Sequence, residues 1–330
     1  MRAMKKKLIL NRFHILMAAF FALAILAESA LAEGLLEVDV AGKPLVNYQL
    51  KPLSNPKGGD RFKGSDFIHP LKTPSGFVLT DIQPGDHLHH FGLWWPWKYV
   101  SNDGRKVLFW ELQKGEGIIK AREAKKTEDG FVAESVYIDR KAKGGPEVWI
   151  EETVDAKVSD IVESPARGYF LDLAIRHVVA GQSPLEIVKY RYSGFALRGT
   201  AEWNRDNSTV LTSEGKDYSE SNFTRARWVL VQGENGEGGK AGVLMMSNPA
   251  NHDHPEKLRT WDPGTHNGAI FINFNPVQVE PWTMRPGKEY VRLYRLFVFD
   301  GSLDAGEAEK LWQMYASLKK IESRLLILKN

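Results

Sequence analysis

Short runs in which apolar and polar residues alternate recur along this chain, and they constrain its fold more than any other feature. A period of two is typical of half-buried β-strands, because successive side chains of a strand point to opposite faces of a sheet. Turn-forming residues such as Asn102-Asp103-Gly104 separate the runs. The clearest runs span residues 130–138, 147–154, 169–177 and 290–299. We therefore expect an all-β protein, built as a large antiparallel β-sandwich with one concave sheet face open to a ligand.

One segment near the end of the chain has the period of a helix instead. Asp304 with Glu307 three residues later forms a capping box, and apolar residues then recur at helical spacing as far as Leu325. We expect a C-terminal helix over about residues 304–327, packed on the outside of the sandwich. The glycine-rich stretch 233–239 lacks the strand and helix that flank a phosphate-binding loop, so it is predicted to be a hairpin tip.

The first 32 residues are predicted to be a signal peptide. Basic residues precede an apolar run from Ile15 to Ala27, and Ala30-Leu31-Ala32 has the small-x-small pattern of a cleavage site. The run is shorter than the roughly 20 residues of a spanning helix, which argues against the alternative of a membrane anchor. We expect a periplasmic or secreted protein, with residues 33–330 forming a single β-sandwich domain that has no membrane contact after cleavage.

Charge and cysteine content exclude several classes of function. The chain has 44 basic and 41 acidic residues, of which the leader holds five and one, so 39 basic and 40 acidic residues follow it. A nearly neutral protein with no basic stripe is not expected to bind nucleic acid. The chain has no cysteine, which excludes disulfides, iron–sulfur clusters and thiolate zinc sites.

The segment from Phe67 to Trp97 is the densest in residues suited to a binding or catalytic site. It holds four of the eight histidines that follow the leader and three of the ten tryptophans. Imidazole can act as an acid, a base or a metal ligand near neutral pH, and indole offers a flat apolar face to a sugar. The candidates in this segment are His69, Lys72, His87, His89, His90, Trp94 and Trp97.

The spacing of these histidines leaves the question of a metal open. In an extended chain His87 and His89 share one face, and His90 points to the other. His87 and His89 could therefore ligate a metal ion, with further ligands from elsewhere in the chain. The alternative is that the histidines bind substrate or satisfy buried backbone groups. We expect no cofactor, with a metal ion as the minority interpretation.

Other candidates are scattered along the chain. Asn248 and His252 belong to a second polar loop, for which a ligand site and a capped turn in water are both open interpretations. Lys189, Tyr190, Arg191 and Tyr192 alternate as in a strand lining a polar cleft. The remaining candidates are Glu111, Glu214 at a turn and Arg176 on a strand. Glu111 follows Trp110, and partial burial there would raise the pKa of its carboxyl group.

Four motifs resemble those of a known family. The chain contains HPL-x-TPSG at residues 69–76, DH-x-HH-x-GLW at 86–94, NP-x-NH-x-HP at 248–255 and PG-x-x-Y-x-x-x-YR followed by DG at 286–301. They resemble an exported bacterial family of unknown function that is commonly labelled methane oxygenase PmoA. The segment from Trp282 to Tyr290 also resembles the end of galactose-mutarotase-like supersandwich domains, in which histidine and a carboxylate act as an acid–base pair on a sugar.

The resemblance implies a supersandwich fold and a carbohydrate-processing protein, with an oligosaccharide or a small molecule derived from a polysaccharide as its partner. We expect acid–base chemistry by a hydrolase, lyase or epimerase. The proton donor would be His89 or His90 and the base Glu214 or Glu111. Trp94 and Trp97 would be sugar platforms, while Lys72 and Arg176 would hold an acidic or hydroxylated group. The alternatives are a non-catalytic carbohydrate-binding protein and a metal-dependent copper oxygenase, as the family label has it.

Overall fold

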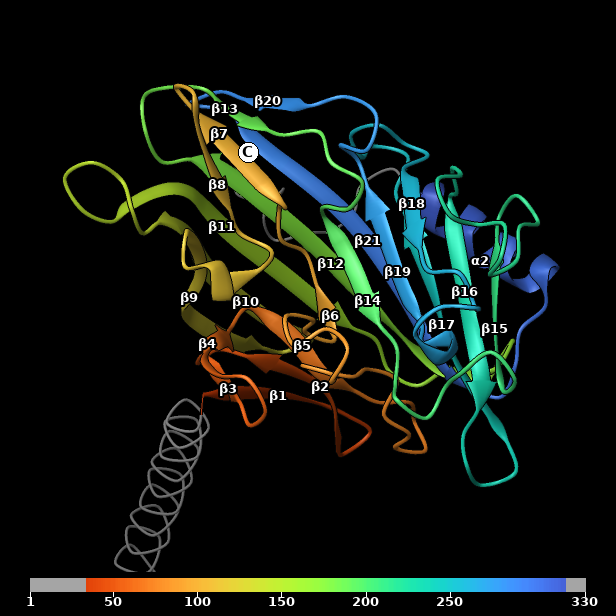
Figure 1. Cartoon of the computed structure of the whole chain (residues 1–330). Coiled ribbons are helices and arrows are strands. Elements are labelled where there is room, and N and C mark those ends of the chain that lie inside the picture. Colours follow the sequence, from red (N-terminus) through yellow and green to blue (C-terminus); the bar gives the residue numbers. More distant parts are fainter. Residues whose placement is uncertain (1–33, 319–330) are drawn as a thin grey trace, which may run out of the picture.

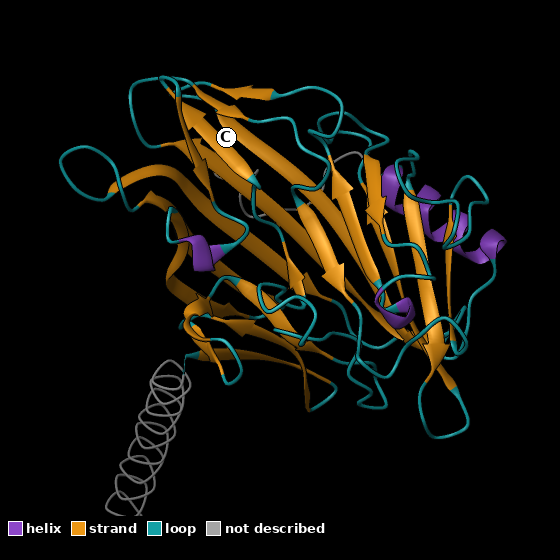
Figure 2. Cartoon of the chain, in the orientation of Figure 1, coloured by secondary structure: helices purple, strands orange, loops and turns teal. Residues whose placement is uncertain are grey.

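The structure is a computed structural model, and it describes residues 34–318. The predicted signal peptide and the end of the predicted C-terminal helix lie outside these residues. Two large antiparallel sheets face each other, with a smaller sheet beside them and a helix at one side (Figures 1 and 2). The expected large antiparallel β-sandwich with a C-terminal helix is therefore confirmed.

The first large sheet has seven strands and lies in front in Figure 1. In spatial order its strands are β1 (Leu35–Val40), β2 (Lys43–Gln49), β5 (Phe67–Leu71), β6 (Leu93–Trp94), β14 (Phe195–Arg198), β19 (Phe271–Asn275) and β18 (Lys257–Thr260). Strands that are far apart in the sequence, such as β6 and β14, are therefore neighbours at the centre of this sheet.

The second large sheet has eight strands and lies behind the first. Its strands follow the order β15 (Ser208–Thr212), β16 (Trp228–Glu234), β17 (Lys240–Ser247), β21 (Glu289–Asp300), β12 (Arg167–Val179), β11 (Glu147–Val158), β10 (Gly130–Asp139) and β9 (Gly117–Thr127). All four runs expected from their alternation are strands of this sheet. The glycine-rich stretch is the tip of the hairpin between β16 and β17, as predicted.

Two smaller sheets complete the described part of the chain. One has the order β20 (Trp282–Met284), β13 (Leu185–Ile187), β7 (Tyr99–Asn102) and β8 (Arg105–Leu108), and the other pairs β3 (Leu53–Asn55) with β4 (Gly59–Gly64). Two short 3-10 turns, η1 (Leu112–Lys114) and η2 (His266–Gly268), lie in the loops. Residues 189–192 form a loop between β13 and β14, so the strand expected there was wrong.

The core lies between the two large sheets because one face of each is apolar. In β12 the alternate residues Tyr169, Leu171, Leu173 and Ile175 are buried in this core. The next residue of that face, His177, is also buried and lies 2.5 Å from Glu152. Polar groups at this depth need partners, and this pair supplies them to each other.

The C-terminal helix α2 (Ala305–Ala316) covers the outer face of the eight-stranded sheet. It starts with the predicted capping box, in which Asp304 accepts a hydrogen bond from the Glu307 N–H and the Glu307 side chain accepts one from Asp304 N–H. Leu311 and Tyr315 pack against Phe297 and its neighbours on that face. The helix therefore lies on the sheet opposite to the candidate site described below.

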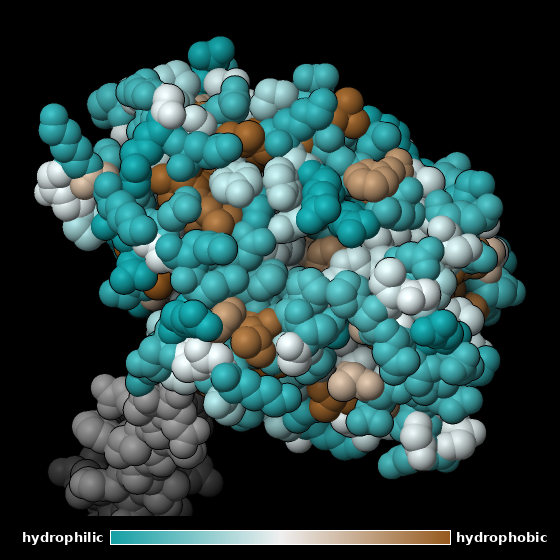
Figure 3. Space-filling view, viewed as in Figure 1, coloured by the Kyte–Doolittle hydropathy of each residue, from teal (hydrophilic) through white to brown (hydrophobic). Residues whose placement is uncertain are grey.

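The surface seen in Figure 3 is mostly hydrophilic, and its hydrophobic groups form small separate areas. Among residues 34–318, no helix has the length and apolar character needed to cross a membrane.

Candidate functional site

A cavity of about 280 Å³ contains most of the predicted histidines. Its walls combine imidazoles, aromatic rings and three charged side chains. The imidazoles are His87, His89, His90 and His266, the rings are Trp110, Tyr192, Trp261 and Phe271, and the charged residues are Glu111, Arg191 and Arg259.

The cavity lies over the outer face of the seven-stranded sheet. Ile272 of β19 points into the core between the large sheets, whereas its neighbour Phe271 points away from it. In β6, Leu93 likewise points into the core and Trp94 points away from it. The outward residues form an aromatic layer, and the histidines pack against this layer. The expected open sheet face thus carries the site.

A compact turn before β6 places three histidines against this aromatic layer. The His87 N–H donates to Pro84 O at 3.0 Å, and the His90 N–H donates to His87 O at 3.0 Å. The turn returns to the sheet through Gly92, whose φ of 64° favours glycine. A side chain there would also clash, because its Cβ would lie 2.7 Å from Ile68 O. The motif at residues 86–94 therefore has a structural cause.

Asp86 connects the turn to two other segments. Its carboxylate accepts hydrogen bonds from both terminal nitrogens of Arg198, at 3.1 and 3.0 Å. Asp86 Oδ2 also lies 3.3 Å from His87 Nδ1 and 3.6 Å from His266 Nδ1. Burial alone would raise the pKa of Asp86, but the contact with His87 and the charge and hydrogen bonds of Arg198 outweigh it and lower the pKa. Asp86 is therefore ionised at neutral pH.

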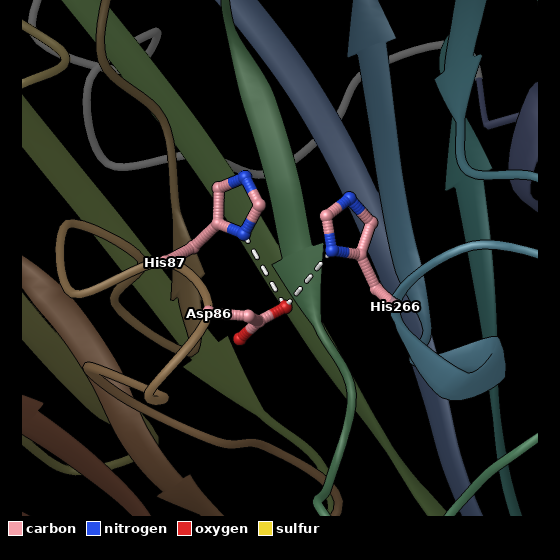
Figure 4. A group of neighbouring side chains, drawn as sticks. All are labelled: Asp86, His87 and His266. Carbon is pink, nitrogen blue, oxygen red and sulfur yellow. Dashed lines mark ion pairs between the residues drawn. The ribbon is translucent and has the colours of Figure 1, made fainter.

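The two imidazoles have the same orientation relative to this carboxylate. In Figure 4 the Nδ1 atoms of His87 and His266 face Asp86, and both Nε2 atoms point away from it. A carboxylate beside Nδ1 favours the tautomer with the proton on that atom, which leaves Nε2 as an acceptor. Asp86, predicted only as part of the motif, thus lies beside the Nδ1 atoms of two imidazoles, although His87 Nδ1 lacks hydrogen-bond geometry to it.

His266 reaches the site through an unusual backbone. It opens η2 with a φ of 49°, and the next residue, Asn267, has a φ of 56°. Non-glycine residues in this left-handed region are uncommon and frequently mark functional segments. Sequence reasoning missed His266 because it stands alone, although the turn signal at Asp262-Pro263-Gly264 places it on a loop near Trp261.

His89 and His90 differ in their surroundings. Burial lowers the pKa of His89 to about 4, although the charge of Glu111 opposes the shift. His90 is buried between Phe271 and Trp261, with ring centroids 5.0 and 5.5 Å away, and burial holds its pKa well below the usual range. Both rings are neutral at pH 7. His89 remains a candidate proton acceptor, whereas the buried His90 packs as part of the wall.

Glu111 is held at the cavity by two partners. Tyr192 OH donates to Glu111 Oε1 at 2.8 Å, and Lys98 Nζ forms a short contact with the other carboxylate oxygen. Burial alone would raise the pKa of Glu111, but the hydrogen bond and charge of Lys98, with the Tyr192 hydroxyl, lower it overall. The expected upward shift was therefore wrong, because the sequence did not reveal Lys98 as a partner.

Two predicted sugar platforms are buried instead. Trp97 is fully buried and its Nε1 donates to His177 Nδ1 at 3.3 Å, between the eight-stranded and four-stranded sheets. Trp94 is 3% exposed and lies beneath His90, with ring centroids 5.1 Å apart. Neither ring has a face available to a sugar, so this assignment is corrected. Trp110 and Trp261 line the cavity in their place.

Four other predicted residues lie elsewhere. Glu214 is exposed in the turn between β15 and β16, where Arg227 Nε donates to it at 3.4 Å. Arg176 pairs with Glu289 at 3.1 Å on the outer face of the eight-stranded sheet. His69 Nδ1 lies 2.8 Å from Thr80 Oγ1. Neither His69 nor Lys72 lines the cavity.

The second polar loop also lies away from the cavity walls. Asn248 is buried, and the His252 ring stacks on Trp282 with centroids 4.2 Å apart. Asn251, between them, donates to Leu293 O at 2.9 Å and accepts from Leu293 N–H at 2.7 Å. The motif at residues 248–255 therefore ties a loop to β21, which accounts for its polar residues without a ligand.

One group of side chains in residues 34–318 could hold a metal ion. It consists of Asp86, His87 and His266, whose ligand atoms lie within 4.8 Å of one another. The predicted pair was His87 with His89, and His89 is not in this group. Of the cavity residues, sequence reasoning had selected His87, His89, His90, Glu111 and Tyr192, and placed Arg191 in a polar cleft. It missed Arg259, His266 and Phe271, which come together only in the folded sheet.

Comparison with solved structures gives remote similarities. The GH36 α-galactosidase AgaA from Geobacillus stearothermophilus has a TM-score of 0.41 and 9% identity, covering 84% of this chain and 42% of that one. A putative kojibiose phosphorylase from human microbiome has a TM-score of 0.36 and 9% identity, covering 89% and 32%. The heparan sulfate lyase HepC mutant from Pedobacter heparinus has a TM-score of 0.32 and 6% identity, covering 78% and 34%. This chain thus spans less than half of each.

No curated protein matches the chain significantly. A family described as a family of unknown function, DUF6807, matches residues 35–313, which include every residue of the cavity. That description assigns no activity, so the methane oxygenase label stays a prediction. The chain belongs to the DUF6807 family of unknown function.

Proposed function

We propose that this protein is exported, binds a carbohydrate in the cavity over the seven-stranded sheet and acts on it by proton transfer. The observation that carries the proposal is the arrangement of Asp86 with His87 and His266. An ionised carboxylate faces Nδ1 of two imidazoles whose Nε2 atoms point away from it. Carboxylate–histidine pairs of this kind are used by enzymes for general acid–base catalysis.

In the proposed chemistry, Nε2 of His87 is the atom that accepts and returns the proton. This atom takes a proton from a hydroxyl or an acidic C–H of the sugar, and Asp86 stabilises the imidazolium that forms. The same Nε2 then returns the proton to the leaving oxygen as its bond to carbon breaks. His89 is a second acceptor, since its pKa of about 4 keeps its ring neutral. His266 shares the carboxylate and places a second imidazole beside it.

The cavity walls supply what sugar recognition requires. Tyr192 presents a half-buried aromatic ring, against which the apolar face of a sugar can pack, while the buried Trp110 and Trp261 form part of the wall. Glu111 with Tyr192 and the two arginines offer hydrogen bonds to hydroxyl groups. A mixed aromatic and polar lining is typical of small-molecule sites.

The test is turnover of native and oxidised oligosaccharides, with products identified by mass spectrometry. His87→Gln should lower kcat by roughly 10²- to 10⁴-fold, and His89→Gln should lower it less. His252→Gln is the matched control, because that ring lies outside the cavity walls. Full activity of His87→Gln with an unchanged melting temperature would remove the assignment. If the wild type binds an oligosaccharide and never converts it, the protein is a binding module.

A metal-assisted reaction is a second candidate, favoured by one observation. Four-coordinate zinc or copper with bonds of about 2.0–2.2 Å separates its ligand atoms by roughly 3.4 Å. The distances of 3.3 and 3.6 Å from Asp86 Oδ2 to the Nδ1 atoms of His87 and His266 fit this spacing. A bound ion would supply Lewis acid or redox chemistry, with these three residues as its ligands. The test is elemental analysis of protein purified without an affinity tag, for which this candidate predicts about one ion per chain. No ion at that ratio would remove it.

A further inference from the structure

A second cavity adjoins the first at a basic wall. A neighbouring cavity of about 580 Å³ shares Arg191 with the first, and it is also lined by Lys189, Lys257 and Phe223. Arg191 and Lys189 come from the loop between β13 and β14, whereas Lys257 and Arg259 come from β18. Two segments far apart in the sequence therefore place four cations along one edge of the site.

These cations have no acidic partner in the described part of the chain. None of the four has a carboxylate within 4.0 Å, in contrast to Arg176, Arg198, Arg225, Arg227 and Arg295, which all pair with acids. Glu111 is the one acidic residue that lines either cavity, and Lys98 already neutralises it. The walls therefore carry an excess of positive charge.

Holding these charges together is unfavourable in the free protein. Burial and the nearby charge of Arg191 lower the pKa of Arg259, and Arg259 Nη1 donates a hydrogen bond to Thr260 O at 3.0 Å. The two guanidinium groups thus keep most of their donors available. Unpaired guanidinium groups at a site are suited to carboxylate or sulfate oxygens, which they bind through two parallel hydrogen bonds.

We propose that the sugar bound in this site is anionic, and that Arg191 and Arg259 hold its carboxylate or sulfate ester group. This inference rests on the proposed function and names the substrate class. Lys189 and Lys257 then contact a further anionic unit in the second cavity. Lys72 and Arg176, the cations expected for this role from the sequence, lie elsewhere.

An exposed aromatic ring at the second cavity supports an extended ligand. Phe223 is 47% exposed, which is unusual among the large apolar side chains of the described residues. It has a left-handed φ of 62°, and Arg259 lies 5.8 Å from its ring centroid. Such a backbone conformation costs free energy in a bulky residue and clusters at ligand sites. A sugar unit stacked on Phe223 would lie next to the basic wall.

The test is calorimetric titration of the purified protein with three oligosaccharide panels of matched length: uncharged, uronic acid and sulfated. We expect binding of one anionic panel, weakened by salt because the charges are screened. Arg191→Gln and Arg259→Gln should each weaken that binding by about tenfold or more. Arg122→Gln, an exposed residue of β9, is the matched control and should leave affinity unchanged. The panel that binds distinguishes a carboxylate from a sulfate ester.

Two outcomes would overturn the inference, and only one of them would also contradict the proposed function. Binding of uncharged oligosaccharides with affinity that neither arginine variant changes would remove the anionic ligand and keep the proposed function. Binding of no panel at all would remove both. Arg191→Gln decides the matter if Arg259→Gln unfolds, because Arg191 is exposed and its replacement leaves the core intact.

Discussion

Arg198 donates two hydrogen bonds to Asp86, at 3.0 and 3.1 Å, and so fixes the plane of its carboxylate beside the imidazole of His87. Arg198 belongs to β14, an interior strand of the seven-stranded sheet between β6 and β19. The turn that carries His87 is thereby tied to the interior of this sheet.

Asp86→Asn should impair catalysis and leave the fold intact. An amide keeps the size of the carboxylate but removes the charge that stabilises a protonated imidazole, and its NH₂ group cannot accept the Nδ1–H. We expect kcat to fall by roughly 10²- to 10⁴-fold. The checks are steady-state kinetics and a melting curve, with Asp81→Asn, on the same loop, as the control. Wild-type kcat in Asp86→Asn would contradict the assignment of Asp86.

The stability of the protein should depend on pH through its buried histidines. Burial lowers the pKa of His69 and of His89 to about 4, whereas the unfolded chain has histidine values near 6.5. Between these values the unfolded state binds more protons, so the free energy of unfolding falls as the pH falls from about 6.5 to about 4.

Each of these groups should contribute on the order of 1 to 3 kcal/mol to that fall. Urea denaturation at pH 7 and at pH 4.5 measures it. His69→Gln should reduce the difference between the two pH values, even if it lowers stability at both. An unchanged difference in the variant would show that His69 does not titrate as its burial implies.

Glu152 should be essential for stability. It is fully buried, accepts hydrogen bonds from Trp95 Nε1 at 3.0 Å and Ser135 Oγ at 2.9 Å, and lies 2.5 Å from His177 Nε2. Glu152→Ala removes all three contacts and leaves Trp95 Nε1 and His177 Nε2 without this acceptor, which should cost about 3–5 kcal/mol of unfolding free energy. Glu134→Ala, exposed on the adjacent strand β10, should change it by less than about 0.5 kcal/mol. Equal effects of the two substitutions would contradict this role.

Two tryptophans should separate stability from binding. Trp261→Ala removes a ring that lines the cavity, so it should weaken oligosaccharide binding by about tenfold or more. Trp97→Phe removes the donor to His177 inside the core, so it should lower stability by about 1–3 kcal/mol and leave affinity unchanged. Calorimetric titration and urea denaturation of both variants distinguish these effects. A loss of affinity in Trp97→Phe alone would show that the sequence-based platform was right.

The β-sandwich and its helix could be predicted because their signals are local. The alternation of Tyr169, Leu171 and Leu173 requires only that one face of a strand be buried, and the capping box of Asp304 lies within one turn of helix. The segment at 189–192 also alternates, yet it is a loop, since its polar side chains line the two cavities and no sheet pairs with it.

Half of the site could not be predicted because it depends on contacts distant in sequence. Asp86 and Arg198 are 112 residues apart, and only the pairing of β6 with β14 makes them neighbours. An HxHH motif indicates a candidate site by its density of histidines, whereas the isolated His266 has no such local signal. Trp97 was misassigned because tryptophans on a core face and on a ligand face look alike until the sheets are packed.

The most direct test of the central claim is a crystal structure of the protein with the oligosaccharide that binds most tightly. The account predicts density for a sugar ring in this cavity, within hydrogen-bond distance of His87 Nε2, with an anionic group on Arg191 and Arg259. Full occupancy of the sugar at any other place, with this cavity empty, would contradict the account.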